Sequence, residues 1–518
     1  MRLPRAPARE ATVEGTRLSA VKPGTAPSRE AALLRGVGLY AVGMLFTRFA
    51  GFLMLPFYTA VLSKEAYGYV DLVLTGSTLF GTVVTLRLFD AIYHTLWDEP
   101  DTGRRAAMIT SVLGLTTINA IAGAALVWGV LALAGIPLPH PWLLLAWTVL
   151  RIPAEFFQQT TRVVGDRSAY AGAAIVNASA MAGSSLLLLG VFKLGALGYL
   201  GAMAAASAAM LVYLLCKDTG ARLVRPRLFS LAVLKPMLAY SLPLVPAAVS
   251  WWVIRMIGRY TLGHSHGLQE VADFAVSDKL PAVVAMLNIT YYMAWQDAVL
   301  RQSSHGDREE HVAFYRRALG AYARLGLVAL GLIALFLRPF FALMIDPSYA
   351  QARTYVPPLL LAVFLLCIGG LYDVLYQQQR RTGAIFATSL VSALAAGVAS
   401  FALVPAYGVW GTVVATMCAA VVLAVIRGVD QYRTLGVTIP LRDVLLGAPF
   451  FALGWLMNAV HDPLRYAVGA ALVCVAAVVT QRSLLIAAWG HWRAGKRAKA
   501  APQANPQANP EASGDDAR

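Results

Sequence analysis

Charged residues are scarce in this chain. They make up 14% of its 518 residues, whereas hydrophobic residues make up 58%, and mean hydropathy is +0.62. A soluble domain carries roughly 25% charged and 45–50% apolar residues, so this balance argues against a soluble protein. The net charge of +16 does not indicate nucleic-acid binding, because the basic residues lie mainly between apolar runs.

Signatures of enzymes and metal sites are also lacking. There is no G-x-S-x-G, P-loop or H-E-x-x-H motif and no acidic metal cluster. The four cysteines are far apart in sequence and lie in or beside apolar runs, which indicates neither a disulfide framework nor a metal site. We therefore expect no enzyme activity, no metal and no cofactor. Residues 1–30 contain no apolar stretch, which argues against a cleaved signal peptide.

Long apolar runs recur along the chain instead. Each is long enough to cross a hydrocarbon core about 30 Å thick at about 1.5 Å of helix rise per residue. Helices satisfy their own backbone hydrogen bonds in lipid, and the alternation typical of a membrane barrel is absent. The sequence thus predicts an all-α polytopic membrane protein with about fourteen transmembrane helices. The expected spans are 36–62, 69–96, 106–135, 141–163, 168–192, 195–216, 236–263, 271–300, 319–345, 354–379, 383–404, 408–428, 441–460 and 464–489.

Basic residues divide the loops into two sets. Loops after even-numbered spans hold about eighteen of them, and loops after odd-numbered spans hold about four. The positive-inside rule therefore places the even loops and both termini in the cytoplasm, and the protein in the cytoplasmic (inner) membrane. The basic set is Arg104, Arg105, Arg162, Arg167, Lys217, Arg222, Arg225, Arg227, Lys235, Arg301, Arg308, Arg316, Arg317, Arg380, Arg381, Arg427, Arg433 and Arg442, and the sparse set is Lys64, Lys193, Arg338 and Arg465.

The two halves of the chain resemble each other weakly. Residues 155–162 and 373–380 both read acid, three residues, Gln, two residues, Arg, and the glycine pair at 198 and 201 matches the pair at 408 and 411. These matches predict two six-helix lobes in the same orientation with a substrate site between them. The expected division is a disordered cytoplasmic tail at 1–32, a first lobe at 33–217, a linker at 218–235, a second lobe at 236–430, two extra helices at 431–490 and a second disordered tail at 491–518.

Charged residues inside the spans are the candidate functional groups, because a charge in lipid is costly and usually faces a cavity or a partner. Five cations could line a cavity and bind phosphate or pyrophosphate; they are Arg48, Arg151, Arg255, Arg259 and Lys279. Arg48 has no acid within four residues and is the strongest candidate. Four carboxylates could couple transport to an ion or simply form ion pairs; they are Asp90, Glu155, Asp278 and Asp373.

Structural pairing competes with a functional role for several of these charges. Arg87 precedes Asp90 by three residues, and Arg151 precedes Glu155 by four, so each pair can meet on one helix face. Arg255 and Asp278 lie at similar distances from the loop between spans 7 and 8, so the two could meet as a buried bridge. Arg48 and Asp71 frame the first hairpin in the same way that Arg255 and Asp278 frame the later one.

The first hairpin also carries a recognisable pattern. Residues 51–59 follow G-F-x-x-x-P-x-Y-T, residues 62–68 follow L-S-x-x-x-Y-G, and residues 240–246 read YSLPLVP. Over about residues 33–430 the chain resembles the polysaccharide transporter (Wzx-type) family. The resemblance implies the two-lobed fold of the multidrug/oligosaccharidyl-lipid/polysaccharide exporter superfamily and a cationic cavity for pyrophosphate. Many relatives carry Asp-Arg in span 7, whereas this chain has Gly258 before Arg259, which puts that pairing in doubt.

The function that the resemblance implies is a flippase that moves undecaprenyl-pyrophosphate-linked oligosaccharide across the membrane by alternating access, for O-antigen, capsule or exopolysaccharide synthesis. Its implied partners are the lipid-linked glycan, membrane lipid, and polysaccharide polymerase and chain-length proteins. Two alternatives share the fold: a flippase for the peptidoglycan lipid precursor, and a cation-coupled multidrug exporter. A glycan polymerase is disfavoured because the outer loops are short.

Overall fold

The computed structural model describes residues 53–97, 99–133, 135, 141–164, 167–217, 223–302, 308–460 and 462–500. These residues form helices and turns, with no strand among them. Seven of the described helices are long and apolar enough to cross a membrane, or eight if the bent pair α9 and α10 counts as one span. The prediction of an all-α, multi-pass membrane protein is therefore confirmed. The count of fourteen stays a prediction, because most of the first expected span lies outside the described residues.

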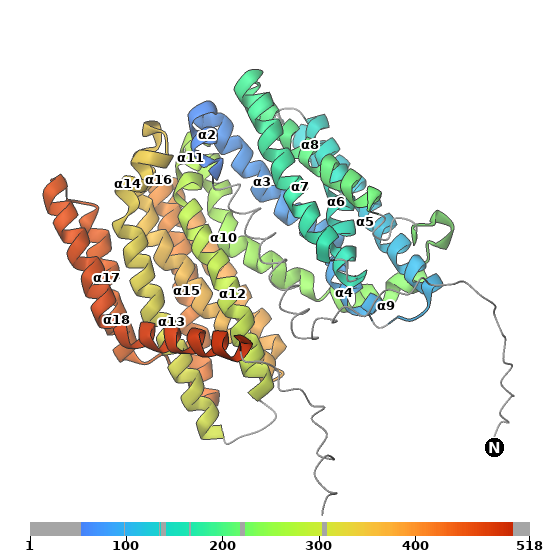
Figure 1. Cartoon of the computed structure of the whole chain (residues 1–518). Coiled ribbons are helices and arrows are strands. Elements are labelled where there is room, and N and C mark those ends of the chain that lie inside the picture. The colour runs from blue at the N-terminus through green and yellow to red at the C-terminus, as the bar shows by residue number, and fades with distance from the viewer. Residues whose placement is uncertain are drawn as a thin grey trace, which may run out of the picture.

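The helices fall into two bundles (Figure 1). The first contains α2 (Leu55–Val61), α3 (Lys64–Thr85), α4 (Leu88–Trp97), α5 (Thr102–Leu133), α6 (Pro141–Val164), α7 (Arg167–Ser185), the π-helix η1 (Leu186–Val191), α8 (Gly195–Cys216), η3 (Pro226–Leu228) and α9 (Leu231–Ser241). The second contains α10 (Leu244–His266), α11 (Leu268–Ser277), α12 (Lys279–Gln302), α13 (Arg308–Leu335), α14 (Leu337–Met344), η4 (Pro347–Tyr349), α15 (Ala352–Gln378) and α16 (Thr382–Leu435), and it is followed by α17 (Leu441–Met457) and α18 (Pro463–Ala500).

The chain passes from the first lobe to the second at a bend. α9 and α10 meet at an angle of 49°, where Pro243 precedes the first residue of α10. Leu234 and Met237 of α9 are buried in the cluster formed by α4, α5 and α6. Residues 231–241, expected partly in a linker and partly in the second lobe, thus pack on the first lobe.

Backbone breaks explain why the helices do not match the spans one to one. Leu86 and Arg87 adopt positive φ values of 49° and 56° and separate α3 from α4. Gly408, with φ 55°, divides α16 into two helical halves, as the spans 383–404 and 408–428 predicted. L-residues rarely adopt positive φ, so the break at residues 86 and 87 is a strained point in the middle of the second expected span.

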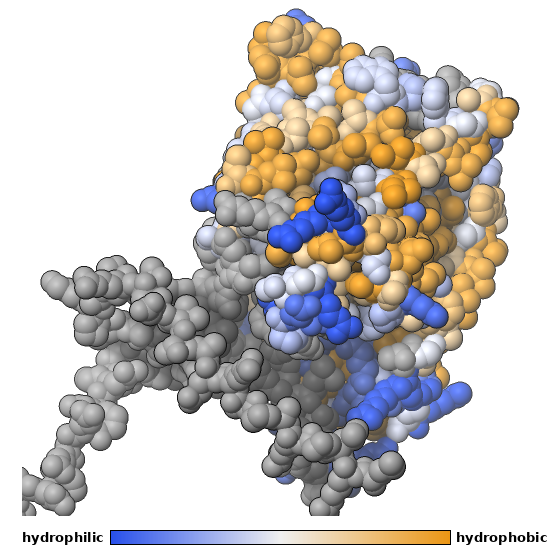
Figure 2. All heavy atoms as spheres, turned by 90° about the vertical axis from the view of Figure 1, so that its right-hand side faces the viewer, coloured by the Kyte–Doolittle hydropathy of each residue, from blue (hydrophilic) through white to orange (hydrophobic). Residues whose placement is uncertain are grey.

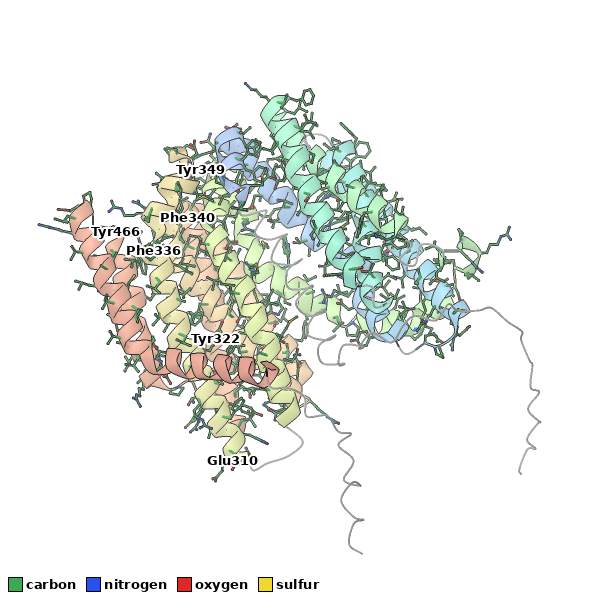
Figure 3. All side chains as sticks on the ribbon, viewed as in Figure 1. Glu310, Tyr322, Phe336, Phe340, Tyr349 and Tyr466 are labelled. Carbon is green, nitrogen blue, oxygen red and sulfur yellow. The ribbon has the colours of Figure 1, made fainter. Side chains whose placement is uncertain are left out.

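Several helices extend beyond their apolar segments. α13 begins at Arg308, eleven residues before the span expected at 319, and Figure 3 shows Glu310 at one end of this helix and Phe336 beyond the other. Its 28 residues correspond to about 42 Å, which exceeds the hydrocarbon thickness of about 30 Å. Residues 491–500, expected in a disordered tail, continue α18. Hydropathy detects only the part of a helix that lies in lipid.

Apolar side chains cover much of the outer surface. Figure 2 shows them across the face of the first lobe, with hydrophilic residues gathered mainly toward its lower end. Leu126, Trp128 and Leu133 of α5 are among the exposed ones. Helices whose apolar residues face outward are expected in lipid, where no water drives those residues inside.

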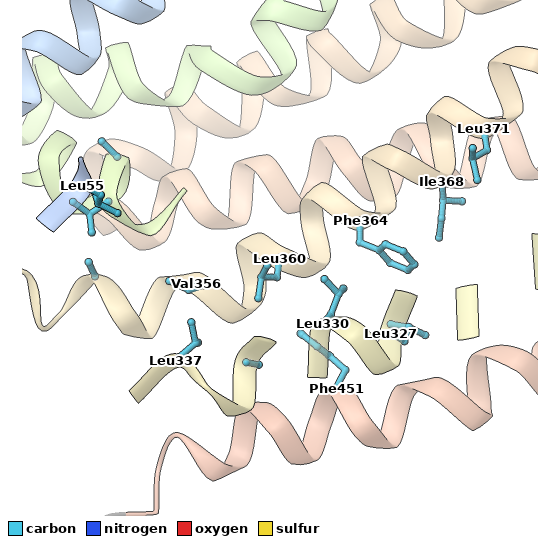
Figure 4. Packing of buried hydrophobic residues seen from close by; sticks show 14 of the residues in the cluster. Leu55, Leu327, Leu330, Leu337, Val356, Leu360, Phe364, Ile368, Leu371 and Phe451 are labelled. Atoms are coloured by element: carbon cyan, nitrogen blue, oxygen red, sulfur yellow. The ribbon is translucent and has the colours of Figure 1, made fainter. Parts of the chain in front are cut away.

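The core of the second lobe is built around α15. Figure 4 shows Val356, Leu360 and Phe364 of this helix packed with residues of α13 and α17, and Leu55 of α2 belongs to the same buried cluster. The first lobe therefore contacts the core of the second at the end where α2 and α3 meet. This contact positions the candidate site.

Candidate functional site

The two lobes come together where α3 lies against α10 and α11 (Figure 1). Gly68 of α3 makes the closest approach, since a Cβ added there would lie 2.9 Å from the carbonyl carbon of Leu268 and 3.2 Å from the amide nitrogen of Ala272. A Cβ essentially never lies within 3.0 Å of another heavy atom. A glycine at position 68 is therefore a condition of this lobe contact, which gives a physical reason for the Tyr-Gly of the first-hairpin pattern.

Arg259 of α10 lies at the centre of this contact. Its Nη2 donates a hydrogen bond of 2.6 Å to Oδ2 of Asp278 in its own lobe, and its Nε lies 3.3 Å from Oδ2 of Asp71 in the first lobe. Nη1 approaches the Thr75 hydroxyl at 3.4 Å, and the guanidinium lies 5.3 Å from the Phe274 ring centroid. We call Arg259, Asp71, Asp278 and Thr75 the Arg259 cluster. Arg259 is 6% exposed, so the cluster is buried.

The two ion pairs of the cluster are unequal. The pair with Asp278 has hydrogen-bond geometry, whereas neither Asp71 Oδ2 nor Arg259 Nε makes a hydrogen bond within the described part of the chain. The shorter, aligned contact is the stronger one. Arg259 is therefore held firmly by the second lobe and more weakly by the first, which suits a contact that opens when the lobes separate.

Further polar contacts reinforce the same interface. Lys64 of α3 donates to Asp273 of α11 at 2.7 Å and lies 4.9 Å from the Tyr349 ring centroid. Figure 3 shows Tyr349 at this end of the molecule. Trp252 Nε1 and the Tyr260 hydroxyl, both on α10, donate hydrogen bonds of 2.9 Å to backbone carbonyls of α3. The lobes are thus joined by charge pairs, hydrogen bonds and close backbone packing.

The bridge considered between Arg255 and Asp278 does not form among the described residues. Asp278 binds Arg259, which lies one helical turn further along α10. A Cβ at Gly258 would lie 2.7 Å from Cγ2 of Thr412, so α16 occupies the space that a carboxylate at position 258 would need. Arg259 pairs instead with Asp71 of α3 and with Asp278, the residue that follows α11. These contacts between helices take the place of a pairing with an acid at position 258.

Two candidate cations have no carboxylate partner in the part of the chain that the structure describes. Lys279 lies 5.7 Å from the ring centroid of Tyr67 on α3, at the lobe interface. Arg255 is half-buried and lies one turn, or about 6 Å, along α10 from Arg259. Because paired charges are already neutralised, these two groups retain the greatest capacity to bind an anion.

The first lobe contains a second charged group. Arg151 and Glu155 of α6 pair at 2.6 Å, and Arg151 also donates to the Ser77 hydroxyl of α3 at 3.0 Å. Both residues line a cavity of about 250 Å³ among α3, α6, α7 and α8. The i, i+4 pairing considered from the sequence is present, and the structure adds the cavity beside it.

The other candidate charges are paired away from the lobe interface. Arg87 and Asp90 form a half-exposed pair at 2.8 Å. Asp373 pairs at 2.7 Å with Arg427, which is fully buried and also donates to the carbonyl of Gly369 and the hydroxyl of Ser389. The assignment of Arg427 to a cytoplasmic loop is wrong, because the hydropathy of the last apolar segment ends before the helix does. Arg48 lies outside the described residues.

No protein-family model and no curated protein matches the sequence. Solved structures do match. The lipid II flippase MurJ in an inward closed conformation aligns with a TM-score of 0.66 at 12% identity, covering 86% of this chain and 99% of that one. This chain has the fold of the MOP-superfamily transporters. An inward-facing multidrug resistance MATE family transporter of that superfamily aligns with a TM-score of 0.60 at 13% identity, covering 77% and 98%, and an outward-facing one with 0.52 at 15%, covering 79% and 96%.

Proposed function

We propose that this protein is a flippase for undecaprenyl-pyrophosphate-linked oligosaccharide, acting by alternating access in the cytoplasmic membrane in surface-polysaccharide synthesis. The observation that carries the proposal is the presence of two unneutralised cations, Lys279 and Arg255, beside the lobe contact of a flippase-like fold. A pyrophosphate is an anion that ammonium and guanidinium groups bind well. A drug exporter for cations would be served better by unpaired carboxylates.

In this proposal the Arg259 cluster is the gate at the outer end. The contact lies next to residues 62–64 and 266–268, which follow odd-numbered spans and are expected to face outward. Separation of the lobes breaks the weaker pair with Asp71 and leaves Arg259 on Asp278. The cluster holds two carboxylates against one guanidinium, so it carries a net charge of −1 when both acids are ionised. A coupling cation is therefore best placed at Asp71 or Asp278.

The likeness to a lipid II flippase favours a second candidate, a flippase for the peptidoglycan precursor. The two candidates differ in cargo and not in geometry. Depletion of the protein separates them: we expect an oligosaccharide-lipid confined to the inner leaflet, with its sugar identified by mass after labelling intact and lysed spheroplasts. Accumulation of the peptidoglycan precursor instead would transfer the assignment. An unchanged lipid pool would point to a small-molecule exporter, to be tested by drug susceptibility.

The cation assignment has its own test in reconstituted vesicles. Lys279→Gln and Arg255→Gln should each reduce flipping of the lipid-linked glycan without preventing membrane insertion. Lys193→Gln is the matched control, because Lys193 is an exposed cation before α8, away from the lobe interface. Equal flipping by Lys279→Gln, Lys193→Gln and the unmodified protein would refute the role of Lys279.

A further inference from the structure

The cavity of about 250 Å³ in the first lobe is lined by uncommonly polar side chains for a membrane interior. Glu155 and Gln158 project from α6, Asn177 from α7 and Ser207 from α8. Polar groups inside a membrane bundle are costly unless they are hydrogen-bonded, and they commonly mark a substrate path. The cavity therefore calls for an explanation beyond packing.

Several of these groups have hydrogen-bonding capacity to spare. The side-chain amide of Gln158 and the hydroxyls of Ser207 and Tyr199 make no hydrogen bond to any residue that the structure describes. Among the described residues, the Asn177 amide donates only to Met210 Sδ, at 3.5 Å, and sulfur is a weak acceptor. Amide and hydroxyl groups that can donate or accept hydrogen bonds thus face one small space. This arrangement complements a molecule with several hydroxyl groups.

The charge of the cavity disfavours an ionic ligand. Arg151 is bound by Glu155 at 2.6 Å and by Ser77 at 3.0 Å, so the positive and negative charges cancel. Two aromatic rings, those of Trp147 and Tyr199, also line the space. Rings that present an apolar face beside polar groups suit the mixed apolar and hydroxylated surface of a sugar.

The size and position of the cavity further limit which ligands fit it. Pockets for drug-sized ligands occupy about 300–1,000 Å³, so this one fits a single sugar ring better than an oligosaccharide. Tyr199 packs edge-on against Tyr58 with ring centroids 5.0 Å apart, and Tyr58 shares a buried cluster with Tyr67, whose ring centroid lies 5.7 Å from the Lys279 ammonium. A phosphate group at Lys279 would therefore lie next to the cavity.

The matching place in the second lobe is closed. Asp373, which corresponds to Glu155 in the sequence repeat, is bound by Arg427, and that side chain is 0% exposed. Arg427 spans from α16 to α15 and uses all of its nitrogens in contacts with these two helices. The cavity in which several polar groups lack hydrogen-bond partners among the described residues therefore occurs in the first lobe and not at the matching place in the second, so the sequence repeat alone does not account for it.

We infer that this cavity is a subsite for one sugar unit of the lipid-linked glycan. The inference rests on the proposed flippase function and adds which part of the cargo binds where. The pyrophosphate lies at Lys279, and the adjoining sugar enters the first lobe between α6 and α8, where Gln158 and Asn177 hydrogen-bond its hydroxyl groups.

The test measures binding of two lipids to the full-length protein in nanodiscs. The probes are undecaprenyl pyrophosphate and the same lipid carrying one N-acetylhexosamine. The unmodified protein should bind the glycosylated lipid about tenfold or more tightly than the bare lipid. The Gln158→Ala/Asn177→Ala double variant should lose this preference while keeping its affinity for bare lipid. Asn119→Ala is the matched control, because Asn119 donates to the Val84 carbonyl of the same lobe outside the cavity.

The outcomes separate the two proposals. If the unmodified protein binds both lipids equally, or if the double variant keeps the preference, the subsite inference fails and the flippase proposal stands. If the unmodified protein binds neither lipid, the flippase proposal fails and the subsite fails with it. Loss of bare-lipid binding in the double variant would also refute the subsite, because these amides would then act on the lipid anchor or on the fold.

Discussion

Replacement of Gly68 by alanine should keep the two lobes apart at the Arg259 cluster. The added methyl would overlap the carbonyl oxygen of Leu268 and lie 2.9 Å from its carbonyl carbon, and ordinary contact begins at 3.4 Å, so the helices must separate by considerably more than about 0.5 Å. The obstacle is backbone and cannot rotate away. Asp71 lies one turn along the same helix face, so the displacement lengthens its contact with Arg259 beyond the present 3.3 Å.

The size of the effect follows from the cost of overpacking. Inserting a methyl group into a tight contact typically costs about 1–3 kcal/mol, which lowers the population of the closed state about 5- to 150-fold relative to an open one. The helix itself is not weakened, because alanine is a better helix former than glycine. The expected phenotype is therefore conformational, with slower flipping and little loss of folded protein.

Cysteine labelling measures this shift. All four native cysteines are replaced, and Thr75→Cys is introduced, since Thr75 is 3% exposed and lies one turn deeper than Asp71. A membrane-impermeant maleimide should label the cysteine at position 75 about 5- to 150-fold faster in the Gly68→Ala protein. Gly81→Ala is the control on the same helix, because no described atom lies within 4 Å of a Cβ added there. Equal labelling rates in the two variants would refute the view that this contact closes the protein.

Three further predictions concern the stability of the second lobe in detergent, measured by thermal unfolding. Arg427→Met should destabilise the protein by about 3–5 kcal/mol by leaving Asp373 buried and unpaired, and recovery on adding Asp373→Leu would confirm the cause. Arg380→Gly should stabilise it by up to about 1 kcal/mol, because Arg380 follows α15 with φ 57°; no gain would argue against strain there. Gly454→Ala should cost about 1–3 kcal/mol and loosen α17 from α13, since its Cβ would lie 2.8 Å from the carbonyl carbon of Gly331; unchanged unfolding would show that α17 is not docked this closely.

Features set by local spacing could be predicted from the sequence, whereas contacts between distant helices could not. Arg151 and Glu155 form the ion pair that their i, i+4 spacing on one helix indicates. The sequence paired Asp278 with Arg255, whereas its partner is Arg259, four residues further on. A position in the membrane estimated by counting residues along two helices has an error of about one turn, and Arg255 and Arg259 lie one turn apart on the same helix face. The cavity beside Glu155 leaves no one-dimensional signal. The Tyr-Gly of the first-hairpin pattern marks Gly68 but does not indicate which helix it contacts, since that depends on how several helices pack.

The carboxylate that recurs in the two lobes, Glu155 in the first and Asp373 in the second, makes different contacts in each. In the second lobe, Asp373 and Arg427 fasten α15 to both halves of α16, and α15 is the most deeply buried of the candidate spans. In the first lobe, Glu155 pairs within its own helix, while strained residues break α3 from α4 and a π-helix ends α7. Breaks of these kinds commonly lie at functional hinges. In the proposed mechanism, the second lobe is the rigid support that carries Arg259, and the first lobe is the part that bends away from it when the gate opens.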